Sequence, residues 1–552
     1  METAAAGAPQ SEKTTPMRTV IVASAAGTAF EWYDFFVYGS LTSIISRKFF
    51  AGLDETAGTL ATLALFAVGL VFRPVGALIF GRIGDTLGRK GAFLMTVIIM
   101  GGATFAIGLL PDNNLVGGAS TVALIVLRIL QGMAVGGEYG GAAIYVAEHA
   151  PADRRGATTA WIQSSAAFGL VGALGIVLMT RSLVGEEAMF DWGWRVPFLA
   201  SAFLLAISIW MRLKLNESPE FTRMKEEGTV SKAPYREAFA PGPNLRNVLI
   251  ILVTLLLAQG PLWYSEFFYT QIFLENFTKV PGFWSNLIMI GAVLFSIPCY
   301  IFFARLSDKV GRKPVMLAGM AVSTIAMFPA FMMMANGANG ALFKAQEQSP
   351  VSITADQSTC SFKIDLLNRL KPQTGCDIAR KTLISAGVSY TTENAPAGTA
   401  PVVHIGGTSV PAPDATGSTG ADLTAKSAEI DKALKAALKD AGYPLTADPA
   451  NFNWVMIVIP FIVLVLAATA LYGPMAAALV ELFPARVRYT ALSVPYHLCI
   501  GVVGGLMPAA AFAIATASGN IFSGLWYPVV FGAIATVCTL LFYPETKGKQ
   551  LS

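Results

Sequence analysis

The chain has 552 residues, of which 54% are hydrophobic and 13% are charged. Soluble domains carry roughly a quarter charged residues, so this composition and a mean hydropathy of +0.57 exclude a soluble protein and indicate a membrane protein. The formal net charge of +4 gives no sign of nucleic-acid binding, and five cysteines are too few for a disulfide scaffold.

Apolar stretches that could cross a bilayer recur along the chain, and each needs about 20 residues as a helix. A polar tail, for which we expect disorder, precedes the first of these stretches. We expect twelve transmembrane helices, six on each side of a polar segment at 214–246. The first six are expected at 19–42, 59–80, 92–111, 120–146, 157–180 and 193–213. The second six are expected at 247–270, 284–304, 314–335, 453–476, 490–516 and 524–543.

The distribution of Lys and Arg predicts the topology, because these residues are enriched in cytoplasmic loops. With both termini in the cytoplasm, most of the basic loop residues lie on the cytoplasmic side. The opposite short loops then contain only Arg47, Lys48, Arg181 and Lys279. We therefore expect a multi-pass protein of a bacterial plasma (inner) membrane with cytoplasmic termini.

Two repeated motifs relate the halves of the chain. GRIGDTLGRK (81–90) and ARLSDKVGRK (304–313) follow the second and eighth expected spans. The pattern E-x-x-P-A-x-x-R begins at Glu148 and again at Glu481, after the fourth and tenth spans. The halves are therefore related six-helix units, the internal repeat expected of a rocking transporter.

The second half contains a long extra segment between these motifs. It falls at 337–450, where the apolar pattern gives way to Gly, Ser, Thr, Pro and Asp. We expect a small outward-facing α+β domain with a helix at 428–444 and a strand in PVVHI (401–405). Cys360 and Cys376 could form a disulfide in an oxidising exterior; free thiols are the alternative. We expect no metal site, because the one local histidine, His404, lies far along the chain.

The predicted fold is an all-α membrane protein. It has twelve transmembrane helices in two pseudo-symmetric six-helix bundles and a small α+β extracytoplasmic insert between the ninth and tenth helices. The expected parts are a disordered cytoplasmic tail (1–17), an N-terminal bundle (18–213), a central cytoplasmic loop (214–246), a C-terminal bundle in two parts (247–336 and 451–545), the insert (337–450), and a cytoplasmic tail (546–552).

Ionisable side chains inside the spans are costly and therefore mark function. Glu31 and Asp34 share one face of the first helix, since they are three positions apart, and Arg128 lies at a similar depth on the fourth. We expect these residues to form a proton-coupling cluster in which either acid could take the proton. The alternative is a permanent ion pair that holds the two helices together.

Other polar residues supply gating and substrate-binding candidates. Arg73 and Glu138 lie at depths that long side chains could bridge, and we expect a structural or gating pair. The glycines of GGEYGG (136–141) predict close helix approach. We expect His497 to be hydrogen-bonded within the structure, with a proton relay as the alternative. The candidates for substrate binding are Arg128, Gln131, Gln163, Gln259, Trp263, Glu266 and Tyr496, of which Gln259, Trp263 and Glu266 would share one face of a regular helix.

Several long motifs now point to a family. They are FEWYDFFVYG (30–39), RPVGALIFGRIGDTLGRK (73–90), RILQGMAVGGEYGGA (128–142), WGWRVPF (192–198), LNESPEF (215–221) and ELFPARVRYTALS (481–493). In this order they resemble the metabolite:proton symporter branch of the major facilitator superfamily. Two positions depart from its loop signature: Thr86 stands where the family has a basic residue, and Ala304 where it has glycine.

The resemblance implies import of proline, betaine, α-ketoglutarate, shikimate, citrate or a dicarboxylate. It implies that an acid and an arginine on the first and fourth helices couple protons to transport. It also implies that the charged loops lock the halves together on the cytoplasmic side. The gating candidates are Arg73, Asp85, Arg89, Glu138, Asp308 and Arg312.

We therefore expect a secondary transporter that imports a small organic acid or zwitterionic osmolyte with protons by alternating access. A proton-driven exporter of the same superfamily and a transporter-like sensor that uses the insert are the alternatives. We expect no enzyme activity, because GMAVGG (132–137) lies inside a membrane helix and is not a phosphate cradle. The expected partners are a small metabolite, the proton and the bilayer, with no nucleic acid, metal or cofactor beyond the coupling proton. We expect a monomer.

Overall fold

The computed structural model describes residues 16–50, 65, 68–356, 358, 360, 374–416, 418 and 420–551. In these residues, eleven helical stretches are long and apolar enough to cross a membrane. Residues 1–15 of the tail expected at 1–17 lie outside the described residues. So do residues 59–64, 66 and 67 of the span expected at 59–80.

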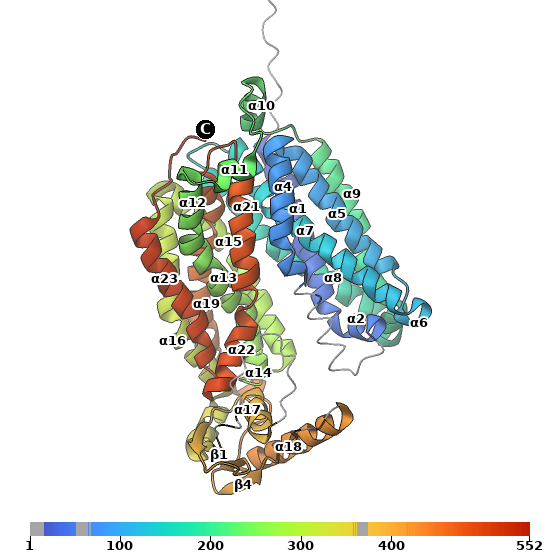
Figure 1. Cartoon of the computed structure of the whole chain (residues 1–552), viewed down its shortest axis with the longest axis vertical. Coiled ribbons are helices and arrows are strands. Elements are labelled where there is room, and N and C mark those ends of the chain that lie inside the picture. The colour runs from blue at the N-terminus through green and yellow to red at the C-terminus, as the bar shows by residue number, and fades with distance from the viewer. Residues whose placement is uncertain are drawn as a thin grey trace, which may run out of the picture.

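The N-terminal half forms one helical bundle, coloured blue to blue-green in Figure 1. Glycines let its helices touch at the backbone: a Cβ on Gly136 would lie 2.0 Å from the carbonyl oxygen of Arg73. This contact confirms the close approach predicted from GGEYGG. The elements are α1 (Met17–Ser40), α2 (Thr42–Phe49), α4 (Arg73–Thr86), α5 (Arg89–Leu109), α6 (Asn113–Val116), α7 (Gly118–His149), α8 (Arg155–Ala188), η1 (Met189–Gly193) and α9 (Arg195–Leu213).

The C-terminal half forms a second bundle, and two short helices, α10 (Pro219–Glu226) and α11 (Pro234–Phe239), lie between the halves in sequence. The seventh expected span is interrupted by π-helical turns and by Pro261, which has no backbone N–H to donate. The elements are α12 (Pro243–Ile251), η2 (Leu252–Leu256), α13 (Leu257–Tyr264), η3 (Ser265–Tyr269), α14 (Thr270–Asn276), α15 (Gly282–Val310), α16 (Arg312–Gln348), α19 (Trp454–Tyr472), α20 (Met475–Val480), α21 (Arg488–Leu498), η5 (Cys499–Gly504), α22 (Met507–Ser518), η6 (Ser523–Leu525) and α23 (Trp526–Phe542).

The two repeated decapeptides end at the same kind of turn. Gly88 and Gly311 precede α5 and α16 with φ of 122° and 116°, a conformation that favours glycine. A carboxylate then accepts hydrogen bonds from the first backbone N–H groups of each helix. Glu217 does so for α5 and Glu545 for α16, as helix N-termini favour.

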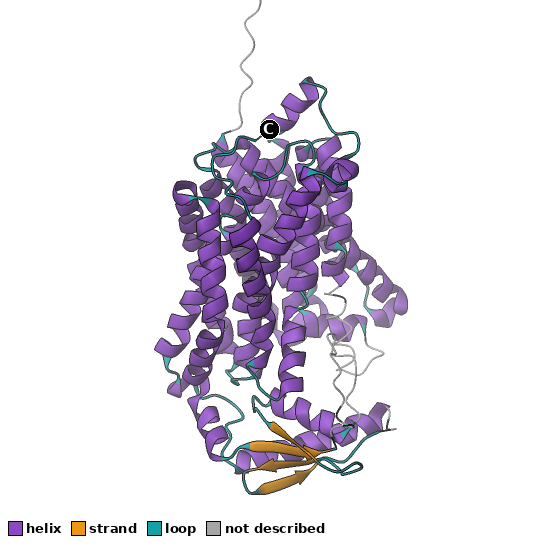
Figure 2. Ribbon diagram, turned by 60° about the vertical axis from the view of Figure 1, so that its left-hand side comes forward, coloured by secondary structure: helices purple, strands orange, loops and turns teal. Residues whose placement is uncertain are grey.

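The bundles meet near the C-terminus and spread apart toward the opposite end, where the described residues between α16 and α19 form a small unit with a sheet and helices (Figure 1). Its four-stranded sheet has the order β2-β1-β3-β4. Strands β1 and β2 are parallel, and the other pairs are antiparallel; Figure 2 shows the sheet at the end of the molecule. The elements are β1 (Val351–Ala355), α17 (Gly375–Ser385), β2 (Thr391–Asn394), β3 (Val402–Ile405), β4 (Thr408–Pro411), α18 (Gly420–Asp440) and η4 (Pro449–Asn451).

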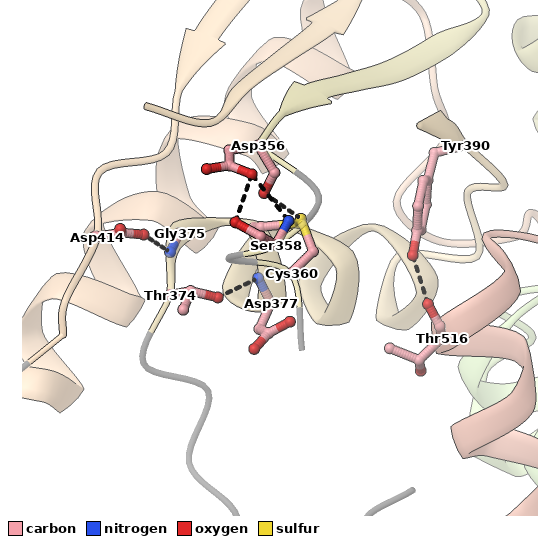
Figure 3. The surroundings of a disulfide bond; sticks show 10 residues. Asp356, Ser358, Cys360, Thr374, Gly375, Asp377, Tyr390, Asp414 and Thr516 are labelled. Carbon is pink, nitrogen blue, oxygen red and sulfur yellow. Dashed lines mark hydrogen bonds between the residues drawn. A yellow bond between two sulfur atoms is a disulfide. The ribbon is translucent and has the colours of Figure 1, made fainter. Parts of the chain in front are cut away.

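Polar contacts fix this unit to the end of the C-terminal bundle. The N–H of Tyr390 donates to the carbonyl of Gly519 at 2.7 Å, and its hydroxyl donates to the carbonyl of Thr516 on α22 at 2.5 Å (Figure 3). The Lys279 ammonium donates to the carbonyl of Ser385, and burial lowers the pKa of this lysine. The unit is therefore seated on turns of the C-terminal bundle.

Three details of this region compare with expectation. A disulfide joins Cys360 and Cys376 beside the start of α17 (Figure 3). Strand β3 lies within PVVHI, as predicted. The ninth span was expected to end near residue 335; helix α16 kinks at Asn339 (φ −150°, ψ 64°), and a further helical stretch continues from there to Gln348. Its added turns are helical because Leu342 and Ala345 are buried in the same apolar cluster as the sheet.

Candidate functional site

A narrow central cavity of about 30 Å³ lies where the two bundles face each other. The N-terminal bundle contributes Glu31 from α1, Arg73 from α4 and Gln163 from α8. The C-terminal bundle contributes Gln259 and Trp263 from α13 and Tyr496 from α21. The cavity therefore contains one acid, one guanidinium and two amides, with which a small polar molecule could pair.

Aromatic rings close around this cavity. Tyr139 stacks on Tyr496 with ring centroids 4.1 Å apart, and the hydroxyls of Tyr472 and Tyr496 lie 2.8 Å apart. The indole N–H of Trp263 donates to the hydroxyl of Tyr300 at 3.0 Å. Rings placed in this way give a rigid apolar lining and also attract a cationic group.

Asp34 lies in a buried hydrogen-bonded chain beside the cavity. Its Oδ2 accepts a hydrogen bond from the hydroxyl of Thr104 at 2.6 Å, and the Gln131 amide donates to the same hydroxyl oxygen at 2.6 Å. Arg128 donates to the Gln131 Oε1 at 2.8 Å, and its guanidinium stands 3.9 Å over the Tyr38 ring. The structure thus joins Asp34 and Arg128 through two polar side chains.

A second small cavity, also of about 30 Å³, lies beside these hydrogen-bonded side chains, and its lining includes Glu31, Asp34, Arg128 and Gln131. Glu31 also lines the central cavity, so it stands between the two spaces. Arg128 and Gln131, predicted as substrate-binding residues, line the small cavity and not the central one. Arg73 is the arginine that lines the central cavity.

Glu138 does not pair with Arg73, so that expected pair is wrong. Glu138 lies 2.5 Å from Arg212 on α9 and accepts a hydrogen bond from Thr96 at 2.7 Å. The reason is helical geometry. Gly136 faces α4, and two residues turn an α-helix by about 200°, so Glu138 points to the other side of α7.

Glu266 is buried away from the central cavity, so its predicted role as a lining residue is also wrong. Its carboxylate accepts a hydrogen bond from Ser323 on α16 at 2.6 Å. The expectation assumed a regular α-helix from Gln259 through Glu266. The π-helical turn η3 begins at Ser265 and changes the direction of the side chains after it.

His497 lines the central cavity, and neither ring nitrogen has a hydrogen-bond partner in the described residues. This contradicts the expectation that the ring is hydrogen-bonded within the structure. The ring instead packs edge-on against Tyr496 with centroids 5.0 Å apart. His497 is therefore a further polar group that faces the cavity.

The end of the molecule near the C-terminus is closed by contacts that cross between the bundles. Asp85, at the end of α4, accepts hydrogen bonds from the backbone N–H groups of Tyr489 (3.1 Å) and Thr490 (2.9 Å), in the first turn of α21. Arg89 pairs with Asp85 at 2.9 Å and donates to the carbonyl of Ala485 at 2.5 Å. A carboxylate at a helix N-terminus is favourable because unpaired N–H groups and the helix dipole point at it.

The mirror contact runs in the opposite direction. Asp308, near the end of α15, accepts hydrogen bonds from the N–H groups of Gly156 (2.9 Å) and Ala157 (2.8 Å), in the first turn of α8. Arg312 pairs with Asp308 at 2.5 Å. Each half therefore caps a helix of the other half.

Buried ion pairs complete this closure. Glu148 lies 2.7 Å from Arg488, and Glu481 lies 2.9 Å from Arg155. Each of these glutamates also contacts the loop arginine of its own half, Glu148 with Arg89 (3.7 Å) and Glu481 with Arg312 (3.1 Å). We call this set the crossed latch; its members are Asp85, Arg89, Glu148, Arg155, Asp308, Arg312, Glu481 and Arg488.

The other end of the molecule is open. A cavity of about 710 Å³ lies between α1 and α8 of one bundle and α13, η3, α14 and α15 of the other. We call it the vestibule. Trp32, Gln163 and Trp263 line both the vestibule and the central cavity, and the two indole rings lie 5.9 Å apart. The vestibule also reaches Arg181, which is about 39 Å along α8 from Arg155 of the crossed latch.

Sequence reasoning missed several of these residues. Arg212 gave no signal, because it lies at a helix end that reads as part of a basic loop. Tyr139 and Tyr472 lie in apolar runs and resemble packing residues. Glu148 and Arg488 belong to the repeated E-x-x-P-A-x-x-R pattern, which could have indicated matched ion pairs.

Three comparisons with known proteins agree on one kind of molecule. Residues 19–238 match the family model described as "Sugar (and other) transporter". The chain is 36% identical to the shikimate transporter of Escherichia coli (strain K12), over 57% of this chain and 72% of that protein. It is 32% identical to the proline/betaine transporter of the same strain, over 59% of this chain and 67% of that protein.

A solved structure of the proton:xylose symporter XylE bound to 6-bromo-6-deoxy-D-glucose superimposes with a TM-score of 0.64 at 15% identity. The match covers 97% of this chain and 97% of that one. At this identity the likeness concerns the fold alone: two helical bundles that face each other. The matched relatives and structures are transporters and not enzymes.

Proposed function

Because this chain belongs to the major facilitator superfamily, in the group that contains the shikimate and proline/betaine transporters, we propose that it imports a small metabolite together with protons. The observation that carries the proposal is a polar cavity between two bundles, closed at one end by the crossed latch and joined to a vestibule at the other. This is the geometry of alternating access in one of its states. The process needs no cofactor other than the coupling proton.

The finer topology is part of the proposal. Twelve transmembrane helices stay our prediction, with the span predicted from the sequence at 59–80 counted beside the eleven stretches of the described residues. The latch end then faces the cytoplasm with both termini, in a bacterial inner membrane, and the vestibule and the insert face outward. The disulfide between Cys360 and Cys376 supports this orientation, because disulfides persist in oxidising compartments. We propose a monomer with the part boundaries given above.

The coupling chemistry is assigned to the first helix. Asp34 and Glu31 are buried acids that share one small cavity with Arg128. When a proton neutralises the acid, Arg128 loses part of its compensating charge, so protonation and conformation become linked. Glu31 links this cavity to the central one, which supports a path from proton to substrate.

The substrate class follows from the central cavity. Arg73 can pair with a carboxylate, while Glu31, Gln163 and Gln259 can accept hydrogen bonds from amine or hydroxyl groups. The aromatic lining favours a compact cationic or ring-shaped body. These groups fit a small organic acid or a zwitterion, the classes that include the substrates named for the two relatives.

Right-side-out vesicles test the direction and the coupling. Shikimate, proline and betaine are added in turn while the external pH is recorded. A symporter raises the external pH as substrate enters. An exporter driven backwards by external substrate exchanges it for internal protons and lowers the external pH, and a sensor moves neither protons nor substrate.

Asp34→Asn tests the coupling residue. We expect it to abolish accumulation against a gradient while exchange of labelled for unlabelled substrate persists. Asp191→Asn, an acid that is 81% exposed on η1, serves as the matched control and should transport normally. Full accumulation by Asp34→Asn would refute this role, and the same test on Glu31→Gln decides between the two acids.

A further inference from the structure

Glu266 is a fully buried acid in the C-terminal bundle. It lies in η3 with no exposed surface, and its Oε1 accepts one hydrogen bond, from the Ser323 hydroxyl on α16 at 2.6 Å. The other oxygen, Oε2, has no hydrogen-bond partner in the part of the chain that the structure describes. An ionised carboxylate at this position would therefore have one buried oxygen without a hydrogen bond, which is unfavourable.

Among the residues that the structure describes, we find no counter-charge near this acid. The elements packed against η3 include α13, α14, α19 and α22, and their titratable side chains are Tyr264, Glu275 and Tyr472. Tyr269 of η3 itself and Tyr300 on α15, which interacts electrostatically with Glu266, are neutral phenols and supply no positive charge. Glu275 is about 13 Å farther along the helix. On α16 the charged residues Arg312, Lys313, Lys344 and Glu347 all lie at least about 15 Å from Ser323. An ionised carboxylate without a partner inside a membrane helix is strongly disfavoured, so Glu266 is a neutral acid in this conformation.

The contact repeats one in the other bundle. In the N-terminal half, an acid on the first span, Asp34, accepts from a hydroxyl on the third span, Thr104, also at 2.6 Å. In the C-terminal half the same two spans supply Glu266 and Ser323. The two halves thus hold related acid–hydroxyl pairs.

The two pairs differ in what surrounds them. Arg128 approaches the first pair through Gln131. Phe461 is the residue that lies as far before Glu481 as Arg128 lies before Glu148, and it is buried on α19. The C-terminal pair therefore has no arginine at the matching place to hold its acid ionised.

We propose that Glu266, held by Ser323, is a second proton-carrying site that exchanges its proton during transport. The proposal rests on the proposed function. Trp263 and Phe267, three residues before and one after Glu266, line the vestibule, so we expect water to reach the acid from that side. The O–H bond of the neutral acid breaks to release a proton to water when the opposite side opens. A proton taken from water on the vestibule side restores it, and no other reactant is needed.

The ratio of protons to substrate tests this inference in the reconstituted full-length protein. The ratio is obtained from the membrane potential that stops net flux of whichever of shikimate, proline and betaine the wild type accumulates. We expect Glu266→Gln to transport uphill with one proton fewer per substrate than wild type. Glu275→Gln, on the same helical run but partly exposed, is the matched control and should keep the wild-type ratio. An unchanged ratio in Glu266→Gln overturns the proposal and leaves a permanently neutral structural acid.

A second measurement covers the case in which Glu266→Gln does not fold or no probe is accumulated. Infrared spectra of the wild type should contain a carbonyl band of a buried protonated carboxyl that shifts in heavy water. Ser323→Ala should move this band, because it removes the one hydrogen bond that described residues make to the Glu266 carboxyl, and Thr324→Ala should not. A band whose frequency changes neither in heavy water nor in Ser323→Ala overturns the proposal. If the wild type moves no protons at all, the proposed function fails together with this inference. If the wild type is proton-coupled and only the Glu266 tests fail, the proposed function stands and this inference alone is overturned.

Discussion

Neutralising Asp85 should open the crossed latch. In the structure this carboxylate accepts two backbone hydrogen bonds from the start of α21, at 3.1 and 2.9 Å, inside a fully buried interface. Asparagine keeps the shape but removes the charge, and its Nδ2, which cannot accept a hydrogen bond, replaces one of the two accepting oxygens. One bond therefore weakens by about 1 to 1.5 kcal/mol and the other, a charged bond of about 1.5 to 3 kcal/mol, is lost, so the two together give about 2.5 to 4.5 kcal/mol.

This free energy is lost only in the state in which the latch is closed. The ratio of closed to open latch should therefore fall about 60- to 2,000-fold in Asp85→Asn. Asp308→Asn should shift the ratio in the same direction, since Asp308 caps α8 in the same way. Lys309→Gln, an exposed change in the same loop, is the matched control.

Spin-label distances across the vestibule measure this shift. Labels at Leu178→Cys and Phe283→Cys would lie on opposite walls of the vestibule. The three free cysteines, Cys299, Cys499 and Cys538, are first replaced while the disulfide is kept. We expect the aspartate variants to gain a population at shorter distance. If both give the distribution of Lys309→Gln, the latch does not control access and the reasoning is refuted.

Three further changes test other parts of the structure. Glu138→Gln leaves the buried guanidinium of Arg212 without its counter-charge, and we expect a loss of about 3 to 5 kcal/mol in stability, seen as a lower melting temperature in detergent; an unchanged melting temperature would contradict the pairing. Reducing the bond between Cys360 and Cys376, which closes a loop of 16 residues, should lower the stability of the insert by about 3 kcal/mol. In intact cells a maleimide should label these cysteines only after reduction, and labelling without reductant would argue against the bond. Deleting 338–452 should preserve transport, because the N–H of Asn453 already donates to the carbonyl of Gly337 at 2.9 Å and a short linker can join them; loss of uptake in a normally inserted protein would show that the insert is part of the mechanism.

The repeated motifs allowed much of the fold to be predicted from sequence. Periodic apolar stretches indicate where helices cross a membrane, and matched motifs indicate that two halves are alike. The turns at Gly88 and Gly311 adopt the same backbone conformation in both decapeptides. These features are local, which is why a single sequence reveals them.

The partners of the charged side chains could not be predicted in the same way. Depth along a helix suggested Arg73 for Glu138, but rotation about the helix axis decides the contact, and Gly136 uses the face toward α4. Likewise, the π-helical turn at Ser265–Tyr269 moves Glu266 off the face shared by Gln259 and Trp263. Neither rotation nor turn type is encoded in the spacing alone.

The crossing of the latch has a mechanical consequence. Asp85 belongs to the N-terminal half but caps α21, while Asp308 belongs to the C-terminal half but caps α8. A rigid tilt of either bundle breaks both caps together, so the closed state gains from two contacts that open in one step. The insert is hydrogen-bonded to turns of the C-terminal bundle at Lys279 and Gly519. It would therefore move with that bundle as one body and would not change the motion of the two bundles relative to each other. This is the physical reason to expect transport without it.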